Sequence, residues 1–218
     1  ARLYASILRY GFRQMVMGED KTNTKTIVLR DSKTVFIPIP KAANSSIRFA
    51  LLPCLGIDPE TIGPGDAIHR DPRIPVLLSD AALRLVEEDW FVFTVVRDPV
   101  DRAVSAYRNK LVEHEPIFNA LRLQGLEKGD DFETFLLSCA RYPAKMLNDH
   151  FMPQHRLLRR AMQSGKLRVF RVETLARDWP VIQDEIERRG GCRPGPLGRL
   201  NATRPKEHSF NPRELALL

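Results

Sequence analysis

Two short segments of the chain carry side chains that could bind a phosphate or sulfate group. The first junction, IPIPKAANSSIR at residues 37–48, places Lys41, Ser45 and Ser46 where an apolar run ends. A strand that turns tightly into a helix leaves backbone N–H groups unpaired at the helix N-terminus, and these favour anions. Lys41 would add a cation and the serines hydroxyl donors. An ordinary helix cap with a surface lysine is the alternative interpretation of this segment.

The second junction is FTVVRDPVDRAVSAYR, residues 93–108. Ser105 follows Arg97 by eight positions, which is about two helical turns, so both could face one phosphate. Arg102 lies between them, and its guanidinium offers forked donors that suit phosphate oxygens. The alternative is an ion pair of Asp98 with one of the two arginines, leaving Ser105 merely solvated.

Strand and helix patterns alternate around these junctions. Apolar runs predict buried strands at residues 34–39, 91–96 and 167–175. Helices are predicted after each run, with Pro99 and Pro180 as helix openings. This order predicts an α/β fold, a parallel sheet flanked by helices, and 218 residues fit a single domain.

The number and spacing of the cysteines indicate whether the chain binds a metal and whether its compartment is reducing. Cys54, Cys139 and Cys192 are odd in number and form no CxxC pair, so we expect a reducing, cytoplasmic location rather than a disulfide scaffold. No Cys pair has zinc-ligand spacing, and we expect no metal. The longest apolar run, Trp90 to Val96, is far shorter than the roughly 20 residues of a membrane-spanning helix. A lumenal domain separated from an N-terminal anchor is the alternative.

The charge balance indicates an anionic partner. Lys and Arg total 34 against 27 Asp and Glu, giving a formal net charge of +7. A nucleic-acid-binding module is one alternative, although its basic residues would be clustered with aromatics, and here they are dispersed among acids. A nucleotide kinase or other phosphotransferase is another, but the Walker pattern GxxxxGK[ST] is absent.

Taken together, PKAANSS and VVRDPVDRAVSAYR resemble the two nucleotide-binding signatures of sulfotransferases that use 3′-phosphoadenosine 5′-phosphosulfate (PAPS). The likeness is closer to the carbohydrate sulfotransferases of the chondroitin 4-O and uronyl 2-O type. It extends loosely to HFMPQH (150–155), FRVETLARD (170–178) and LNATR (200–204).

The resemblance implies a P-loop-like sulfotransferase fold, and we expect a single domain over residues 1–218. Within it we expect an N-terminal helix at 2–17, a PAPS-binding core at about 34–175 and a C-terminal helix and loop at 180–218. It also implies PAPS as the co-substrate, PAP as the desulfonated product and a hydroxyl of a carbohydrate as the acceptor. Arg204 or Thr203 would touch the 3′-phosphate or the adenine, unless that segment is a plain surface loop. The implied ligands of the 5′-phosphosulfate are Lys41, Ala42, Ala43, Asn44, Ser45 and Ser46, and those of the 3′-phosphate are Arg97 and Ser105.

In-line sulfuryl transfer requires a cation at the leaving phosphate and a general base at the acceptor hydroxyl. Lys41 suits the first task. For the base we expect His69, which lies between the two junctions as in uronyl 2-O sulfotransferases. His150 and His155 are the alternatives, because they flank FMPQ (151–154), a segment that we expect on the acceptor side of the site. A carboxylate such as Asp66 or Glu113 would need its pKa raised by burial. The sequence identifies neither the acceptor nor the oligomeric state.

Overall fold

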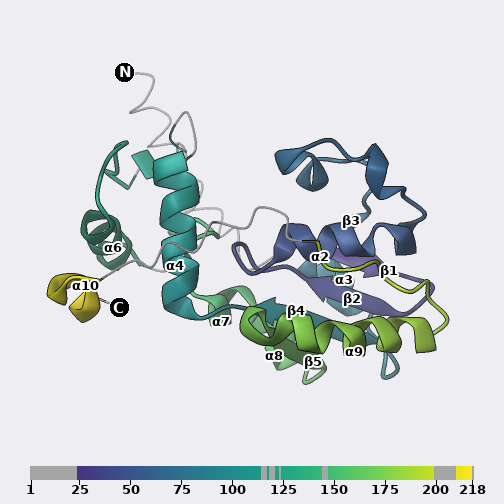
Figure 1. Cartoon of the computed structure of the whole chain (residues 1–218). Coiled ribbons are helices and arrows are strands. Elements are labelled where there is room, and N and C mark those ends of the chain that lie inside the picture. The colour runs from purple at the N-terminus through teal and green to yellow at the C-terminus, as the bar shows by residue number, and fades with distance from the viewer. Residues whose placement is uncertain are drawn as a thin grey trace, which may run out of the picture. The chain divides into compact units, whose positions relative to one another are not determined.

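The computed structural model describes residues 24–113, 117, 121–122, 124–143, 147–198 and 210–217. The chain divides into two compact units, which are described separately (Figure 1). The helix predicted at 2–17 and the loop predicted at 200–204, with Arg204, lie outside the described residues. The sheet unit comprises Thr22–Pro99 and Gln154–Arg204, and the helical unit comprises Ala1–Lys21, Val100–Pro153 and Pro205–Leu218.

A five-stranded mixed sheet forms the centre of the sheet unit, in the order β3-β1-β2-β4-β5. β2, β4 and β5 are parallel, whereas β1 pairs antiparallel with both β2 and β3. The α/β class and the parallel arrangement of the three predicted strands are thus confirmed, and two antiparallel strands extend the sheet. The bounds are β1 Lys25–Leu29, β2 Thr34–Ile37, β3 Val76–Leu78, β4 Phe91–Val96 and β5 Leu167–Arg171.

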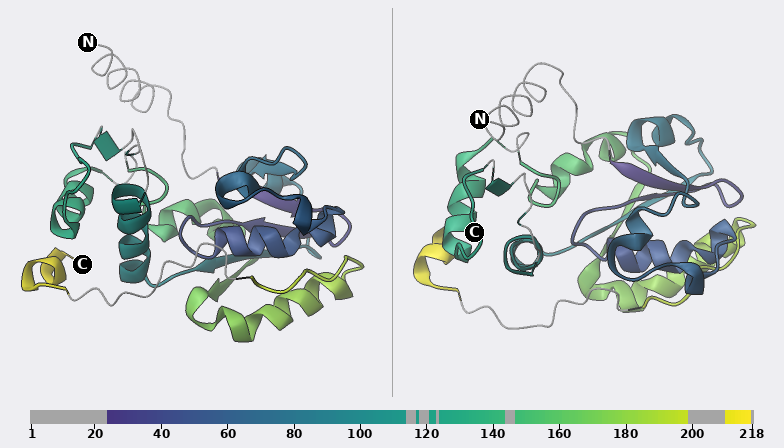
Figure 2. Two further views of the ribbon diagram at one scale, coloured as in Figure 1. Left: turned by 45° about the horizontal axis from the view of Figure 1, so that its top comes forward. Right: turned by 90° about the horizontal axis from the view of Figure 1, so that it is seen from above.

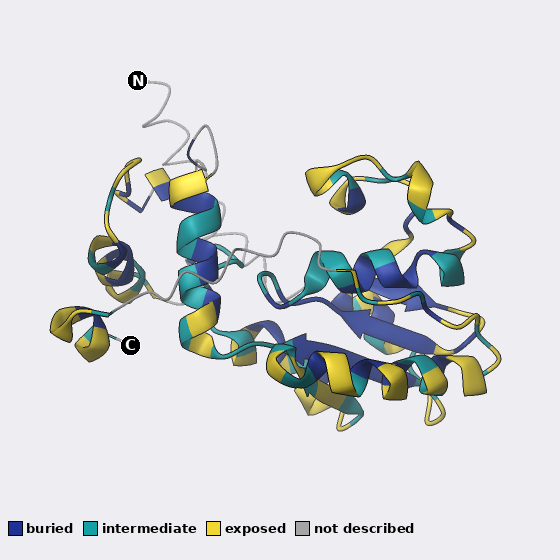
Figure 3. Cartoon of the chain, viewed as in Figure 1, coloured by how far each residue is buried: buried dark blue, intermediate teal, exposed yellow. Residues whose placement is uncertain are grey.

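The two central strands are buried on both faces, because they are built from apolar and β-branched residues without alternation (Figure 3). β4 matches the predicted strand at both ends, and β2 ends two residues earlier than predicted. β5 ends at Arg171 because the chain turns there into the 3₁₀ helix η6 (Val172–Thr174).

One face of the sheet carries the main core. Phe36 and Phe93 stack with ring centroids 5.0 Å apart, and both side chains are buried. Helices α2 (Asn44–Leu51) and α9 (Leu175–Arg188) pack against this face and run along it (Figures 1 and 2). From the helices, the core receives Ile47, Ala50, Leu51, Leu175, Trp179, Ile182 and Ile186.

Helix α9 begins at Leu175 rather than at Pro180, where its start was predicted. Leu175 and Trp179 lie one turn apart and are both buried, so their packing draws the preceding turn into the helix. The helix ends at Arg188, before the predicted glycine stop, and Gly190 adopts a positive φ of 83°.

Short helices complete the sheet unit. α3 (Ser79–Arg84) packs against β1, β3 and α8 (Arg159–Gln163). The three cysteines are free, and the Cys54 thiol donates a hydrogen bond to the Cys192 carbonyl oxygen at 2.7 Å. Among the described residues of this unit, the remaining helices are η1 Pro53–Leu55, η2 Pro59–Thr61, η3 Gly65–His69, α3 Ser79–Arg84, α7 Gln154–Leu157 and α8 Arg159–Gln163.

The helical unit is organised around aromatic side chains. Phe132 and Phe135 on α6 (Phe132–Arg141) stack with their ring centroids 5.8 Å apart, and Tyr107 lies against both rings. This unit also contains α4 Pro99–Tyr107, whose first residue belongs to the sheet unit, the π-helical turn η4 Arg108–Glu113, and α10 Pro212–Leu217. None of the helices that the structure describes is both long and apolar enough to cross a membrane.

Candidate active site

The first junction has an unusual backbone. Lys41 and Ala43 adopt left-handed conformations with φ of 67° and 55°, although neither is glycine. Each such residue costs about 1–2 kcal/mol, and strain of this kind is concentrated at functional sites. Ala42, which lies between them in the chain, is fully buried. Its N–H donates to the carbonyl of Ile39 at 3.2 Å.

The start of α2 therefore differs from an ordinary cap. Ala43 occupies the cap position and provides no side-chain hydrogen bond, while Asn44, Ser45 and Ser46 lie inside the first turn. The N–H of Ile47 donates to the Ala43 carbonyl at 3.0 Å, so the three preceding N–H groups come before the helical hydrogen-bond pattern begins. This arrangement fits the N–H cradle that binds sulfate or phosphate at a helix N-terminus.

Arg48 orients one residue of this cradle. Its Nε donates to the Asn44 Oδ1 at 2.8 Å, and its Nη2 donates to the Lys25 carbonyl at 3.3 Å. The Arg48 side chain is buried, and this burial lowers its pKa to about 10. Because the Asn44 oxygen already accepts a bond, its NH₂ group is left as the donor. The i, i+4 spacing of Asn44 and Arg48 was a signal that the sequence analysis missed.

His69 contacts the first junction directly. Its Nε2 lies 2.8 Å from the Ser45 Oγ, although the two residues are 24 positions apart. His69 ends the short helix η3, and the neighbouring residue Ile68 is buried in the main core together with residues of α2. This apolar anchor explains how an exposed loop histidine is held beside the helix N-terminus.

At the end of β4, the second junction is held by two side chains from distant parts of the chain. Gln154 exchanges two hydrogen bonds with the backbone of Arg97, and Glu173 accepts one from the Asp98 N–H at 2.7 Å. The buried Thr94 hydroxyl donates to the Ile37 carbonyl at 2.7 Å and links β4 to β2. Arg97 is thus fixed at the carboxyl end of a central strand, as predicted.

The rest of the second junction lies in the helical unit. Ser105 is buried on α4. Arg102 is also buried, and its two Nη groups donate to the carbonyls of Met152 and Asp149, each at 2.9 Å. Burial lowers the pKa of Arg102 to about 10. These bonds hold the chain at Asp149 and Met152, just before and within the HFMPQH segment. Neither sequence-based interpretation of Arg102 anticipated this role.

The comparison with known protein families decides between the remaining classes of function. A family model described as the sulfotransferase family matches residues 24–191, which include most of the sheet unit and both junctions. The chain belongs to the sulfotransferase family. No curated protein and no solved structure matches the chain.

Family membership means that the chain is a sulfuryl-transferring enzyme, and PAPS is the general sulfate donor of sulfotransferases. The first junction fits that donor, because its cradle and Lys41 provide the donors and the cation that an anionic group needs. Among the described residues, no group of three or more His, Cys, Asp or Glu side chains could hold a metal ion.

The alternative bases occupy different surroundings. His150, in the helical unit, has its Nδ1 2.7 Å from the Asn148 Oδ1 and 2.9 Å from the Asp149 Oδ1. His155 is exposed on α7 of the sheet unit. Of the three histidines considered as the base, His69 is the one for which a contact with the first junction is shown.

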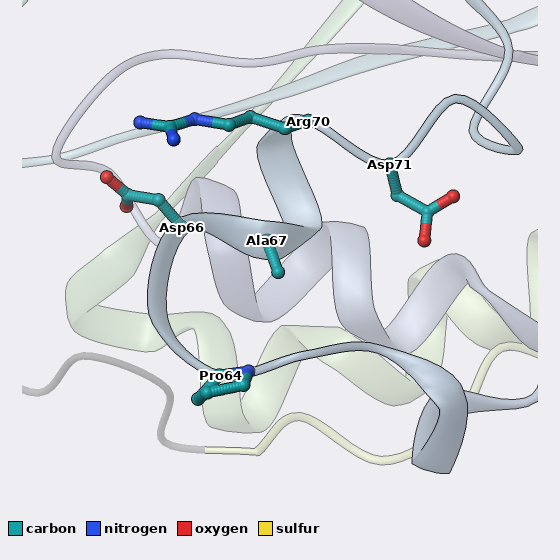
Figure 4. A pocket seen from close by; sticks show the side chains of 5 residues that line it. All are labelled: Pro64, Asp66, Ala67, Arg70 and Asp71. Atoms are coloured by element: carbon teal, nitrogen blue, oxygen red, sulfur yellow. The ribbon is translucent and has the colours of Figure 1, made fainter.

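A shallow hollow of about 490 Å³ lies beside η3, the helix that carries His69. Asp66 and Arg70 extend toward the same side of η3, whereas Asp71 points the other way (Figure 4). Hydrogen bonds from Arg73 lower the pKa of Asp71 to about 2, so this carboxylate is already engaged. The lining residues are Pro64, Asp66, Ala67, Arg70 and Asp71.

Proposed function

We propose that the chain transfers a sulfuryl group from PAPS to a hydroxyl group of a carbohydrate, with His69 as the general base. The observation that carries this proposal is the 2.8 Å contact between the His69 Nε2 and the Oγ of Ser45, a residue of the first junction, in a chain of the sulfotransferase family. This contact puts a titratable nitrogen beside the residues assigned to the phosphosulfate.

The proposed roles follow from the chemistry of in-line displacement at sulfur. PAPS supplies the sulfuryl group and a phosphate leaving group. His69 takes the proton of the acceptor hydroxyl while the hydroxyl oxygen forms a bond to sulfur. At the same time, the bond between sulfur and the 5′-phosphate oxygen breaks. Lys41 and the N–H groups at the start of α2 neutralise the negative charge that develops on that phosphate.

The 3′-phosphate is assigned to Arg97 and Ser105 by the family signature, and the fixed backbone of Arg97 supports this role. For the acceptor, the resemblance to carbohydrate sulfotransferases favours a sugar hydroxyl. Polar side chains beside η3, such as Asp66 and Arg70, could form hydrogen bonds with it. Incubation with labelled PAPS and a panel of glycans, lipids and phenols tests the acceptor class.

Replacing the base separates chemistry from binding. We expect His69→Ala to bind PAP with unchanged affinity in calorimetry, yet to lose at least about ten-fold in turnover, because a positioned base contributes roughly 10²–10⁴-fold. Full activity in this variant would contradict the assignment and move the base to His150 or His155.

Ligand-dependent thermal stability tests the function class. A ligand that binds the folded state raises the melting temperature by mass action. Stabilisation by PAP, without stabilisation by ATP or a DNA oligomer, supports the proposal. Stabilisation by ATP instead of PAP would favour a phosphotransferase, and stabilisation by DNA would favour a nucleic-acid-binding module.

A further inference from the structure

Gln154 uses both ends of its side-chain amide on the backbone of one residue. Its Oε1 accepts a hydrogen bond from the Arg97 N–H at 3.0 Å, and its Nε2 donates to the Arg97 carbonyl at 2.7 Å. The two residues are 57 positions apart in the chain, and both belong to the sheet unit. Gln154 is the first residue of α7, so its backbone is set by a helix start.

This pair of bonds continues the sheet by one residue. The last paired residues of β4 and β5 are Val96 and Arg171, so Arg97 lies just beyond the ladder. A primary amide carries a donor and an acceptor in one plane, as a peptide group does, and can therefore replace a neighbouring strand. Fixing both backbone groups of Arg97 also fixes the direction in which its side chain leaves the chain.

The chemistry of glutamine suits this position. A glutamate could accept the bond from the Arg97 N–H, but it could not donate to the carbonyl. It would also place a negative charge beside a residue assigned to a phosphate, which would weaken anion binding. An apolar side chain of similar length would leave the N–H and the carbonyl of Arg97 without these partners.

We propose that Gln154 is a positioning residue for the nucleotide 3′-phosphate. It acts through Arg97, by holding the backbone from which the guanidinium reaches the ligand, and does not itself touch the nucleotide. This inference rests on the proposed role of Arg97 in PAPS binding. It assigns part of the HFMPQH segment to nucleotide recognition, whereas the sequence placed that segment on the acceptor side.

The test compares two nucleotides that differ in the 3′-phosphate. PAP carries this group and adenosine 5′-phosphate lacks it, and the dissociation constant of each is measured by calorimetry or competition. We expect Gln154→Met to weaken the binding of PAP about five- to ten-fold and to change the affinity for adenosine 5′-phosphate by no more than about two-fold, because the lost interaction is with the 3′-phosphate. A general defect in folding would weaken the binding of both nucleotides.

Two comparisons sharpen this result. Gln183→Met is the matched control, because the Gln183 Nε2 also donates to a backbone carbonyl, that of Pro194 at 2.7 Å, and we expect it to leave the preference for PAP unchanged. In an Arg97→Ala background, which should already have lost the preference, Gln154→Met should have no further effect. Gln154→Asn, which keeps the amide but is one methylene shorter, should reproduce the loss if the methionine variant does not fold.

The outcomes separate the two proposals. Equal weakening of both nucleotides by Gln154→Met, or no weakening of either, overturns the positioning role. If Arg97→Ala binds PAP normally, the assignment of the 3′-phosphate to Arg97 fails first, and with it the basis of this inference. If Arg97→Ala loses the preference for PAP while Gln154→Met and Gln154→Asn keep it, the positioning role fails and the assignment of Arg97 stands.

Discussion

The first junction is shaped mainly by its own backbone, whereas the second junction is held by side chains from distant parts of the sequence. Between β2 and α2, two left-handed residues, Lys41 and Ala43, make the bend within a few positions. After β4, the backbone of Arg97 and Asp98 is held by Gln154 and Glu173.

This difference fits a division of labour between the junctions. A bond-breaking step needs donors held rigidly around the developing charge, and in a locally strained turn the positions of the backbone N–H donors are set by the turn itself. An anchoring site for a second phosphate needs orientation but little chemistry. We therefore expect damage at the first junction to reduce turnover and damage at the second to reduce affinity.

The largest effect should come from removing one cation at each junction. We expect Lys41→Ala to lower turnover about 10²–10³-fold, because it removes charge stabilisation at the leaving phosphate. Arg97→Ala should mainly weaken PAP binding, with a smaller change in turnover at saturating PAPS. Steady-state kinetics and calorimetry with PAP measure the two effects. Both variants should bind PAP more weakly than the unchanged protein, and unchanged affinity in both would refute the two-site arrangement.

Intermediate effects are expected from the buried arginines that support each junction. Arg102→Met would leave the carbonyls of Met152 and Asp149 without their donors, and we expect it to lower the free energy of unfolding by about 2–3 kcal/mol. Arg48→Met should cost about 1 kcal/mol, since one of its two hydrogen bonds is long at 3.3 Å. Urea unfolding measures both free energies. A larger loss of stability in Arg48→Met than in Arg102→Met would contradict this expectation.

The smallest effect should be a gain in stability at the first junction. Ala43 has a φ of 55°, a conformation that glycine adopts without strain, so Ala43→Gly should raise the free energy of unfolding by about 0.5 kcal/mol. The matched substitution Ala50→Gly, in the interior of the same helix, should lower it by about 1 kcal/mol or more. If both changes destabilise the protein equally, the positive φ of Ala43 is not a source of strain.

The sequence predicted the parts of the fold that depend on local pattern. The run FVFTVV specified β4 at both ends, since an uninterrupted apolar stretch has few alternatives to a buried strand. The short strand β3 lacks such a signal: three residues are too few to show a pattern, and its pairing with β1 depends on contacts distant in sequence. The start of α9 was misplaced because the packing of Trp179 outweighed the preference of Pro180 for a first turn.

The candidate site, like the fold, was predictable where it depends on local pattern. The motif residues of both junctions were identified from type and spacing, and His69 was chosen for its place in the chain. What supports them was not predictable. The bonds of Gln154 and Arg102 reach backbone groups about 50 positions away, and any buried backbone group can accept such a partner, so the residue types alone carry no signal.

The hydrogen bond from Thr94 to Ile37 has a further consequence. These two residues are paired across β2 and β4 in parallel register, so the strand ends that lead into the two junctions have a fixed spacing. A ligand that reaches both junctions then binds as a chelate: once one end is held, the other meets its partner at a high effective concentration. Nucleotides that carry both anionic groups should therefore gain more affinity than the two groups contribute separately. The spacing set by the sheet would favour ligands whose two anionic groups are the same distance apart.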